Sequence, residues 1–292
     1  MGTDSFDSLP SIDADTFINC AANVKHFSSG TDIEDVNYYA VKNIIKYCKS
    51  TGLRLVHVST VSSAGENVDN MTSVEYYNEQ MLYINQALTS KYSSSKYLAE
   101  RDILEEVAKG FNAKIMRVGN LSARASDGEF QINFKTNSAV GRIKAVYVVG
   151  AYDYKSMSDT IEFTAIDNCA KAILILANTP KDCVVFHPYN NHNHIMEDVF
   201  TAMHDLGFKL DVVDTITYNK MLEETKNDPE KSKILSSFIA YDRADGRDSY
   251  EIPPSNSYTM EILYRNNFRW PVTSIEYMKK FLKALSELDY FE

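Results

Sequence analysis

The chain has 292 residues, enough for one large domain or two small ones. Hydrophobic residues make up 44% and charged residues 24%, which is typical of a folded globular protein and excludes a collagen-like or disordered chain. The net charge is −10, and phosphate binding needs clustered basic residues, so we expect no nucleic-acid partner. No apolar run reaches the ~20 residues of a membrane helix, and the polar, acidic N-terminus is not a signal peptide.

The four cysteines lie far apart in the sequence and show no paired spacing. We interpret them as reduced residues of the protein core, which places the chain in the cytoplasm and predicts no metal site: Cys20, Cys48, Cys169 and Cys183.

Glycine spacing is the first informative feature. The chain has 11 glycines, and no two of them are closer than nine residues. A dinucleotide-binding loop needs glycines two and three residues apart, and a phosphate-binding loop needs them five apart. This chain contains neither loop, and it also lacks the G-x-S-x-G and H-E-x-x-H motifs of serine hydrolases and zinc proteases.

The first part of the chain alternates between apolar runs and helical patterns. Residues 15–22, 53–60 and 113–118 are short apolar runs and predict buried strands. Apolar residues three and four apart predict a helix over 32–50, and a second helix is expected over 86–109 after a polar loop. Strands and helices that alternate with short connections predict a parallel sheet with helices on its faces.

The pattern loosens after about residue 125. The further predicted elements are helices over 167–178, 196–206 and 276–288, and strands over 183–188 and 209–213. We therefore expect an α/β fold with two regions. Residues 1–150 would form a truncated Rossmann-like region with the catalytic residues, and residues 151–292 a smaller, mainly helical region that binds the substrate and its carrier.

Tyr92 and Lys96 are four residues apart on a predicted helix, so both side chains point from one face. A phenol has a pKa near ~10, and a neighbouring ammonium group favours the phenolate and lowers that pKa. Such a pair can protonate a carbonyl oxygen while a hydride reaches the carbonyl carbon. The same spacing also occurs at Tyr38 and Lys42, so the motif alone does not identify the site.

Position decides between the two pairs. Ligands of an open parallel sheet bind at the carboxyl ends of the strands. Tyr92 follows the strand that ends in Ser59 and Thr60, whereas Tyr38 precedes it. We therefore predict that Thr60 binds the substrate carbonyl and that Tyr38 belongs to a surface or packing pair on a helix. Ser59, Ser62 and Ser63 are weaker candidates, because serines at a strand end usually cap turns.

The ordered set of motifs resembles an extended short-chain dehydrogenase/reductase, and more narrowly the terminal thioester reductase domains of nonribosomal peptide synthetases. The segments that carry this resemblance cover most of the chain: INCAANVKHF (18–27), DVNYYAVKNIIKYC (35–48), VHVSTVSSAG (56–65), YSSSKYLAE (92–100), MRVGNLSAR (116–124), IEFTAIDNCAKAILILA (161–177) and TMEILYRNNFRWPVTSIEYMKKFL (259–282).

The resemblance implies roles for individual residues. Thr60, Tyr92 and Lys96 match the catalytic residues, and Asn37 matches the helix asparagine that supports the active site. The positions that match the cofactor-binding segments are Ala21, Ala22, Asn23, Val24, Tyr92, Lys96, Val118, Gly119 and Asn120.

The chain also departs from the family pattern. The family begins with a strand, a glycine-rich loop, a helix and two further strands, and none of these is present. The resemblance therefore implies a partial Rossmann-like sheet without its first strands, in a fragment of a longer reductase. Because the pyrophosphate of NADPH is bound by that loop, we expect the chain alone to bind NADPH weakly.

The expected reaction is NADPH-dependent reduction of a peptidyl or acyl thioester held on a phosphopantetheinyl carrier protein, which releases an aldehyde or an alcohol. One alternative is a nucleotide-sugar epimerase or dehydratase of the same fold. A second alternative is a sensor or scaffold without catalysis, which the missing glycine loop would favour. The histidines of HPYNNHNH (187–194) could in principle bind a metal, but we interpret this segment as a polar loop and predict no metal site.

Overall fold

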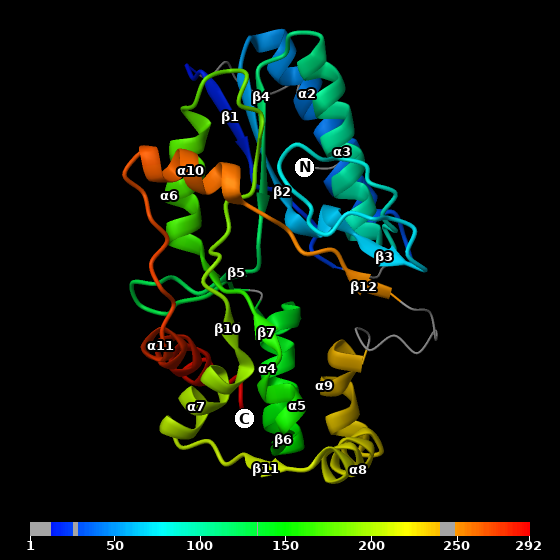
Figure 1. The fold of residues 1–292 in the computed structure, drawn as a ribbon, viewed down its shortest axis with the longest axis vertical. Coiled ribbons are helices and arrows are strands. Elements are labelled where there is room, and N and C mark those ends of the chain that lie inside the picture. The colour runs from blue at the N-terminus through cyan, green and yellow to red at the C-terminus, as the bar shows by residue number, and fades with distance from the viewer. Residues whose placement is uncertain (1–12, 26–28, 133, 240–248) are drawn as a thin grey trace. The chain divides into compact units, whose positions relative to one another are not determined.

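The computed structural model describes residues 13–25, 29–132, 134–239 and 249–292 (Figure 1). The chain forms two compact units, and neither is one continuous stretch. Unit 1 comprises Met1–Gly119, Ala170–Tyr189 and Arg247–Arg269, and unit 2 comprises Asn120–Cys169, Asn190–Gly246 and Trp270–Glu292. These units are defined by compactness, whereas the boundary predicted at residue 150 separates a catalytic region from a substrate-binding region. That functional boundary stays a prediction.

Unit 1 contains a four-stranded parallel sheet. Its strands lie in the order β1 (Thr16–Asn19), β2 (Arg54–Thr60), β4 (Ala113–Val118) and β9 (Val185–Phe186). β2 and β4 are fully paired from Leu55 opposite Ala113 to Thr60 opposite Val118. The predicted α/β fold with a parallel sheet is therefore confirmed.

Helices of unit 1 cover the sheet with apolar faces. α2 (Ala40–Thr51) and α3 (Lys91–Ala108) pack against β2 and β4. The core between these elements consists of buried aliphatic residues, among them Ile44, Leu55, Ile103 and Ile115. α10 (Ser257–Arg265) and most of α6 (Ile166–Ala177) also belong to this unit.

The helix predicted over 32–50 contains a π-helical turn. It begins as α1 (Asp32–Glu34), continues as a π-helix (Asp35–Tyr39) and then becomes α2. A π-turn adds one residue to the turn, and such turns are frequent at functional sites. The helix ends at Gly52, whose φ of 74° is the left-handed conformation that glycine adopts without strain.

The segment 61–85, predicted as a polar loop, is largely loop but contains two short elements that the sequence did not predict. Val61–Ala64 form a 3-10 turn, and β3 (Glu66–Val68) pairs with β12 (Ser249–Glu251). The helix α3 also starts later than predicted, because the hydroxyl of Ser90 accepts a hydrogen bond from the N–H of Ser93 and caps it.

Unit 2 is built mainly from helices and very short strands. Its helices are α4 (Ser138–Val149), α5 (Tyr154–Met157), α7 (Met196–Asp205), α8 (Thr215–Lys226), α9 (Pro229–Ile239) and α11 (Ile275–Ser286). Its strands are β5 (Leu121–Ser122), β6 (Ala151–Asp153), β7 (Thr160–Ile161), β8 (Thr164–Ala165), β10 (His194–Ile195) and β11 (Asp211–Val213). Its main core gathers aromatic and aliphatic side chains of α4, α7 and α11, such as Val146, Phe200 and Phe281.

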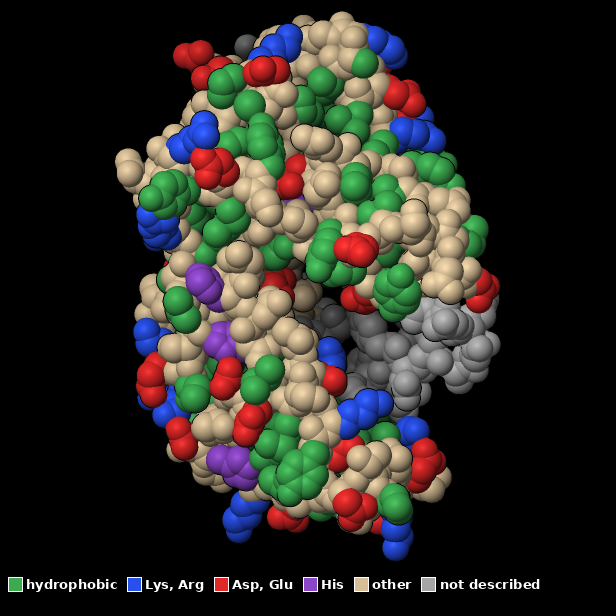
Figure 2. Space-filling view, in the orientation of Figure 1, with side chains coloured by type: hydrophobic (Ala, Val, Ile, Leu, Met, Phe, Trp, Pro, Cys, Tyr) green, Lys and Arg blue, Asp and Glu red, His purple; other side chains and the backbone are tan. Residues whose placement is uncertain are grey.

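Basic and acidic side chains are interspersed on the face that Figure 2 shows, and no large basic patch lies on that face. None of the helices in the described ranges is long and apolar enough to cross a bilayer. All four cysteines are free thiols. The prediction that they are core residues holds for Cys48 and Cys169. It was wrong for Cys20, which is exposed just after β1 ends, and Cys183 is only half-buried.

Candidate active site

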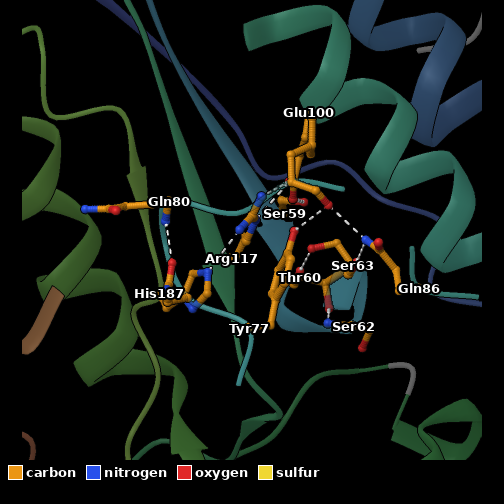
Figure 3. Close-up of polar contacts among 12 residues, drawn as sticks. Ser59, Thr60, Ser62, Ser63, Tyr77, Gln80, Gln86, Glu100, Arg117 and His187 are labelled. Carbon is orange, nitrogen blue, oxygen red and sulfur yellow. Dashed lines mark hydrogen bonds and ion pairs between the residues drawn. The ribbon is translucent and has the colours of Figure 1, made fainter. Parts of the chain in front are cut away.

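Thr60 is the last residue of β2 and is 6% exposed. Its Oγ1 accepts a hydrogen bond from the N–H of Ser62 at 3.1 Å, and its carbonyl accepts one from the hydroxyl of Ser63 at 2.9 Å (Figure 3). Thr60 therefore caps the 3-10 turn that follows the strand. A threonine hydroxyl that accepts one bond still has its own hydrogen to donate, so this role leaves Thr60 able to bind a carbonyl oxygen.

Tyr92 and Lys96 lie one turn apart near the start of α3, as predicted from their spacing. Tyr92 is half-buried and Lys96 is 1% exposed. The Nζ of Lys96 donates a hydrogen bond to the carbonyl oxygen of Val58 at 2.6 Å, two residues before Thr60. This hydrogen bond joins α3, which carries the predicted tyrosine–lysine pair, to β2, which ends at the predicted hydroxyl residue Thr60.

The environment of Lys96 makes its charge responsive to pH. Burial lowers the pKa of Lys96 to about 8, although the nearby Glu100 and Cys20 act in the opposite direction. At neutral pH the ammonium group still predominates. Val58 is the one acceptor that the Nζ has among the described residues, so further N–H groups remain for a ligand hydroxyl.

The segment Ala21–Val24, predicted to lie along the cofactor, is held by two asparagines. The Oδ1 of Asn19 accepts a hydrogen bond from the N–H of Ala21 at 3.1 Å. The side chain of Asn37, which lies in the π-turn and is fully buried, bonds both the N–H of Asn23 at 2.8 Å and its carbonyl oxygen at 2.9 Å. The backbone of this turn is thus fixed, while Ala22 and Val24 are exposed.

His57 lies fully buried in β2 beside this turn. The Nδ2 of Asn19 is 3.1 Å from its Nδ1, and Asn19 must donate here because its Oδ1 already accepts from Ala21. Burial and the positive charge of Lys96 lower the pKa of His57 well below its usual value, so the ring is neutral. Its Nε2 has no hydrogen-bond partner among the described residues.

The three residues predicted after the next strand divide between the two units. Val118 is the last residue of β4 and lies directly opposite Thr60 in the sheet, so these two predicted residues are neighbours. Gly119 ends the first segment of unit 1, and Asn120 begins unit 2. In unit 2 the N–H of Asn120 donates to a carboxylate oxygen of Glu162 at 2.6 Å.

The second tyrosine–lysine pair is a surface pair. The Nζ of Lys42 is 3.4 Å from the hydroxyl of Tyr38, and Arg101 approaches the same hydroxyl at 3.4 Å. Lys42 also lies 3.9 Å from Asp102. The pair thus belongs to a set of partly exposed charges between the π-turn and α3.

The rings of His187 and His194, two of the three histidines in the 187–194 segment, have hydrogen-bond partners in the protein. His187 uses Nδ1 with the carbonyl of Ser255 at 2.8 Å and Nε2 with Arg117 at 3.2 Å. His194 contacts Asp198 through Nδ1 at 2.9 Å and Thr273 through Nε2. No group of three or more metal-binding side chains occurs within the ranges that the structure describes.

Sequence reasoning missed two groups of polar residues. One is Glu162, whose carboxyl contacts Asn120 and Thr164 and whose pKa is raised to about 7 by burial. The other is the buried ion pair between Glu100 and Arg117, with an oxygen–nitrogen distance of 2.7 Å. Glu100 follows Lys96 by one helical turn, and this spacing is the sequence feature that could have identified Glu100 as a residue near the site.

A parallel sheet that places a hydroxyl residue at a strand end and a tyrosine–lysine pair on the following helix is the arrangement of a short-chain dehydrogenase/reductase. Residues 2–173 match the NAD-binding family described as male sterility protein. The chain belongs to this family, and the resemblance inferred from its motifs is confirmed.

Relatives of the chain occur in nonribosomal peptide synthesis. It is 22% identical over 236 residues to a component of the linear gramicidin synthase of Brevibacillus parabrevis, covering 78% of this chain and 4% of that protein. It is similar to a thiolation-reductase di-domain from an archaeal nonribosomal peptide synthetase, with 34% identity and a TM-score of 0.85 over 95% of this chain and 58% of that one. The reductase domain of the aureusimine biosynthetic cluster shares the fold, with 21% identity, a TM-score of 0.78 and coverages of 98% and 72%. The chain thus spans little more than half of the archaeal di-domain and a small part of the synthase.

Proposed function

We propose that the chain carries the catalytic residues of an NADPH-dependent thioester reductase, which releases a peptidyl or acyl group from a phosphopantetheinyl carrier protein as an aldehyde. The observation that carries the proposal is the hydrogen bond from Lys96 to Val58, which joins the helix of Tyr92 to the strand end of Thr60. The 34% identity to a thiolation-reductase di-domain supports the substrate class.

The described residues fit the nicotinamide–ribose end of the cofactor. Lys96 has N–H groups left for ribose hydroxyls, and the turn with Ala21 and Ala22 offers a fixed backbone with small side chains. Asn23 and Val24, Val118 and Gly119, and Asn120 in unit 2 remain the other proposed cofactor contacts. A bound nicotinamide supplies the hydride in this chemistry, whereas the sequence has no closely spaced glycines for the pyrophosphate.

The residues of the chain act on the carbonyl oxygen. The hydroxyls of Thr60 and Tyr92 donate hydrogen bonds to the negative charge that develops on this oxygen. Tyr92 then transfers its proton to this oxygen, and the ammonium of Lys96, one helical turn away, stabilises the phenolate that remains. The hemithioacetal formed in this way loses the carrier thiol and leaves an aldehyde.

Two alternatives remain open on chemical grounds. A nucleotide-sugar epimerase or dehydratase would use the same three residues, and a non-catalytic sensor would need none of them. The match to synthetase reductases favours the thioester over the sugar nucleotide. A cytoplasmic location stays a prediction from the cysteine content.

The test compares substrates with the full chain at millimolar NADPH, so that a weak cofactor affinity does not hide turnover. A carrier protein loaded with an acyl thioester is mixed with the chain, and aldehyde and NADP⁺ are measured by mass spectrometry. Aldehyde formation that needs both reagents supports the proposal. Conversion of UDP- or dTDP-sugars, or NADPH binding without turnover on either class, overturns it in favour of the matching alternative.

A further inference from the structure

A buried carboxylate lies at the centre of unit 1. Glu100 is fully buried on α3, and each of its two oxygens has a partner. Oε1 accepts a hydrogen bond from the hydroxyl of Ser59 on β2, and Oε2 accepts one from the Nε of Arg117 on β4 at 2.8 Å (Figure 3). One side chain therefore joins the helix to the two central strands of the sheet.

Arg117, the partner of this carboxylate, makes two further contacts. The guanidinium of Arg117 lies 4.6 Å from the ring centre of Tyr77, and its Nη1 is 3.2 Å from the Nε2 of His187. Because the Nδ1 of His187 donates to the carbonyl of Ser255, Nε2 is the acceptor. Burial and the charge of Arg117 lower the pKa of His187 to about 3, so this ring adds no charge.

Each partner of Glu100 adjoins a residue of the proposed site. Ser59 precedes Thr60, and Arg117 precedes Val118, which lies opposite Thr60 in the sheet. Glu100 itself is one turn after Lys96, on the same face of α3. The carboxylate of Glu100 thus joins the middle of α3 to the ends of β2 and β4, next to Thr60 and Val118.

Glu100 also influences the charge of Lys96. Burial lowers the pKa of Lys96, and Glu100 is the carboxylate that acts against this effect. The other titratable groups that interact with Lys96 are Cys20 after β1 and His57 on β2, and Tyr92 lies one turn before Lys96 on α3. Partial desolvation raises the pKa of Cys20, although this residue is exposed, and burial lowers the pKa of His57, so both are neutral near pH 7.

We propose that Glu100 is a positioning residue of the reductase site: it fixes the strand end of Thr60 against the helix of Tyr92 and Lys96, and its negative charge keeps the buried Lys96 protonated. This inference rests on the proposed function for its role in turnover. The part that concerns the charge of Lys96 can be tested without turnover.

The experiment uses the full chain with ¹³C-labelled lysine, in which the Cε signal of Lys96 is assigned with the variant Lys96→Arg. We expect a titration midpoint near the pKa of about 8 for the unchanged chain, and a lower midpoint for Glu100→Gln. In a kinetic pH profile the alkaline limb should move to lower pH in the same variant, and kcat at neutral pH should fall by up to ~10²-fold because the reacting groups are displaced. Glu105→Gln, on the exposed side of the same helix, is the control and should change neither quantity.

Two further variants distinguish the effect of the Glu100 charge on Lys96 from the effect of Glu100 on positioning and folding. Glu100→Asp keeps the charge but is too short to reach both strands, so kcat should fall while the Lys96 midpoint stays near that of the unchanged chain. Glu100→Gln leaves Arg117 without its carboxylate and can prevent folding, which circular dichroism would show. The double variant Glu100→Met/Arg117→Met leaves no unpaired charge, and it should fold and still show the lower midpoint.

An unchanged Lys96 midpoint in both Glu100→Gln and the double variant would overturn the proposal. An unchanged kcat in Glu100→Asp would overturn its positioning part. If the unchanged chain reduces no thioester, the proposed function fails, and the Lys96 titration still decides whether Glu100 controls this charge.

Discussion

The side-chain amide of Asn37 bonds both polar backbone groups of Asn23, the N–H at 2.8 Å and the carbonyl oxygen at 2.9 Å. A residue of the π-turn thus fixes the turn that follows β1. An asparagine fits because it combines a donor and an acceptor in one plane, whereas aspartate would place a carboxylate oxygen against the carbonyl of Asn23.

Asn37→Ala should therefore lower the free energy of unfolding by about 1–3 kcal/mol, since it leaves partly buried backbone groups without partners. It should also weaken NADPH binding, because the turn loses its fixed shape. Urea unfolding and calorimetric titration measure the two effects. Asn178→Ala, which removes an exposed bond to Leu174 at the end of α6, is the control and should cost far less. Equal losses in the two variants would contradict the role of Asn37.

Tyr92→Phe removes the proposed proton donor and keeps the ring. Thioester reduction should fall by ~10²–10⁴-fold, the usual contribution of a general acid, with little change in cofactor affinity. Single-turnover NADPH oxidation on a carrier-bound thioester measures the rate. Tyr38→Phe is the matched control and should keep a normal rate, because Tyr38 lies in a partly exposed set of charges. A normal rate for Tyr92→Phe together with a strongly reduced rate for Tyr38→Phe would show that the wrong tyrosine–lysine pair was chosen.

The 292-residue chain should bind NADPH with an affinity weaker than low micromolar, because no glycine-rich loop offers backbone amides to the pyrophosphate. Isothermal titration calorimetry is the measurement. Lys96→Ala should weaken the residual binding further, since the lysine contacts the ribose in the proposed site. A low-micromolar dissociation constant for the chain alone would mean that other residues bind the pyrophosphate.

Glu162 makes the stability of unit 2 depend on pH. Burial raises its pKa in the folded chain from an ordinary value of 4.5 to about 7. Its contribution to stability is therefore complete below about pH 4.5 and is lost as the pH rises through 7. Glu162→Gln cannot ionise, so its free energy of unfolding minus that of the unchanged chain should become more positive between pH 5 and pH 8. Urea unfolding at several pH values tests this, and a difference that stays constant would exclude the raised pKa.

Gly65 follows the 3-10 turn at the end of β2 with a φ of 65° and a ψ of −155°, a conformation open mainly to glycine. A Cβ at this position would lie 2.6 Å from the carbonyl oxygen of Ala87. Gly65→Ala should therefore lower the unfolding free energy by more than about 2 kcal/mol. Gly110→Ala is the control, because Gly110 also has a positive φ but nothing lies within 4 Å of a Cβ there. A smaller loss for Gly65→Ala than for the control would refute the steric argument.

The strands β1, β2 and β4 could be predicted from the sequence because buried parallel strands are continuous apolar runs. The spacing of Tyr92 and Lys96 likewise predicted their common helix face. The burial of Glu100 and Arg117 could not be predicted, because a charged residue at a helical or strand position is usually exposed. Only the packing of α3 against β4 brings these two charges together.

The division of the chain into two units could not be predicted from the sequence either. A local pattern shows that β9 or α10 exists, but it does not show which sheet or helix each will join. The segments 170–189 and 247–269 return to unit 1 through long-range pairing, such as β9 with β4 and β12 with β3. The π-turn around Asn37 has no distinct periodicity either, because one additional residue in a turn leaves the apolar spacing nearly unchanged.

The interleaved path of the chain constrains the order of events during its synthesis. The first 119 residues leave the ribosome with β4 as an open sheet edge, because its neighbour β9 lies at Val185–Phe186. The last helix of unit 1, α10, follows only after most of unit 2 has been made. A nascent chain that pauses between residues 150 and 185 therefore exposes an unpaired strand, and it will depend on chaperones or aggregate until translation resumes.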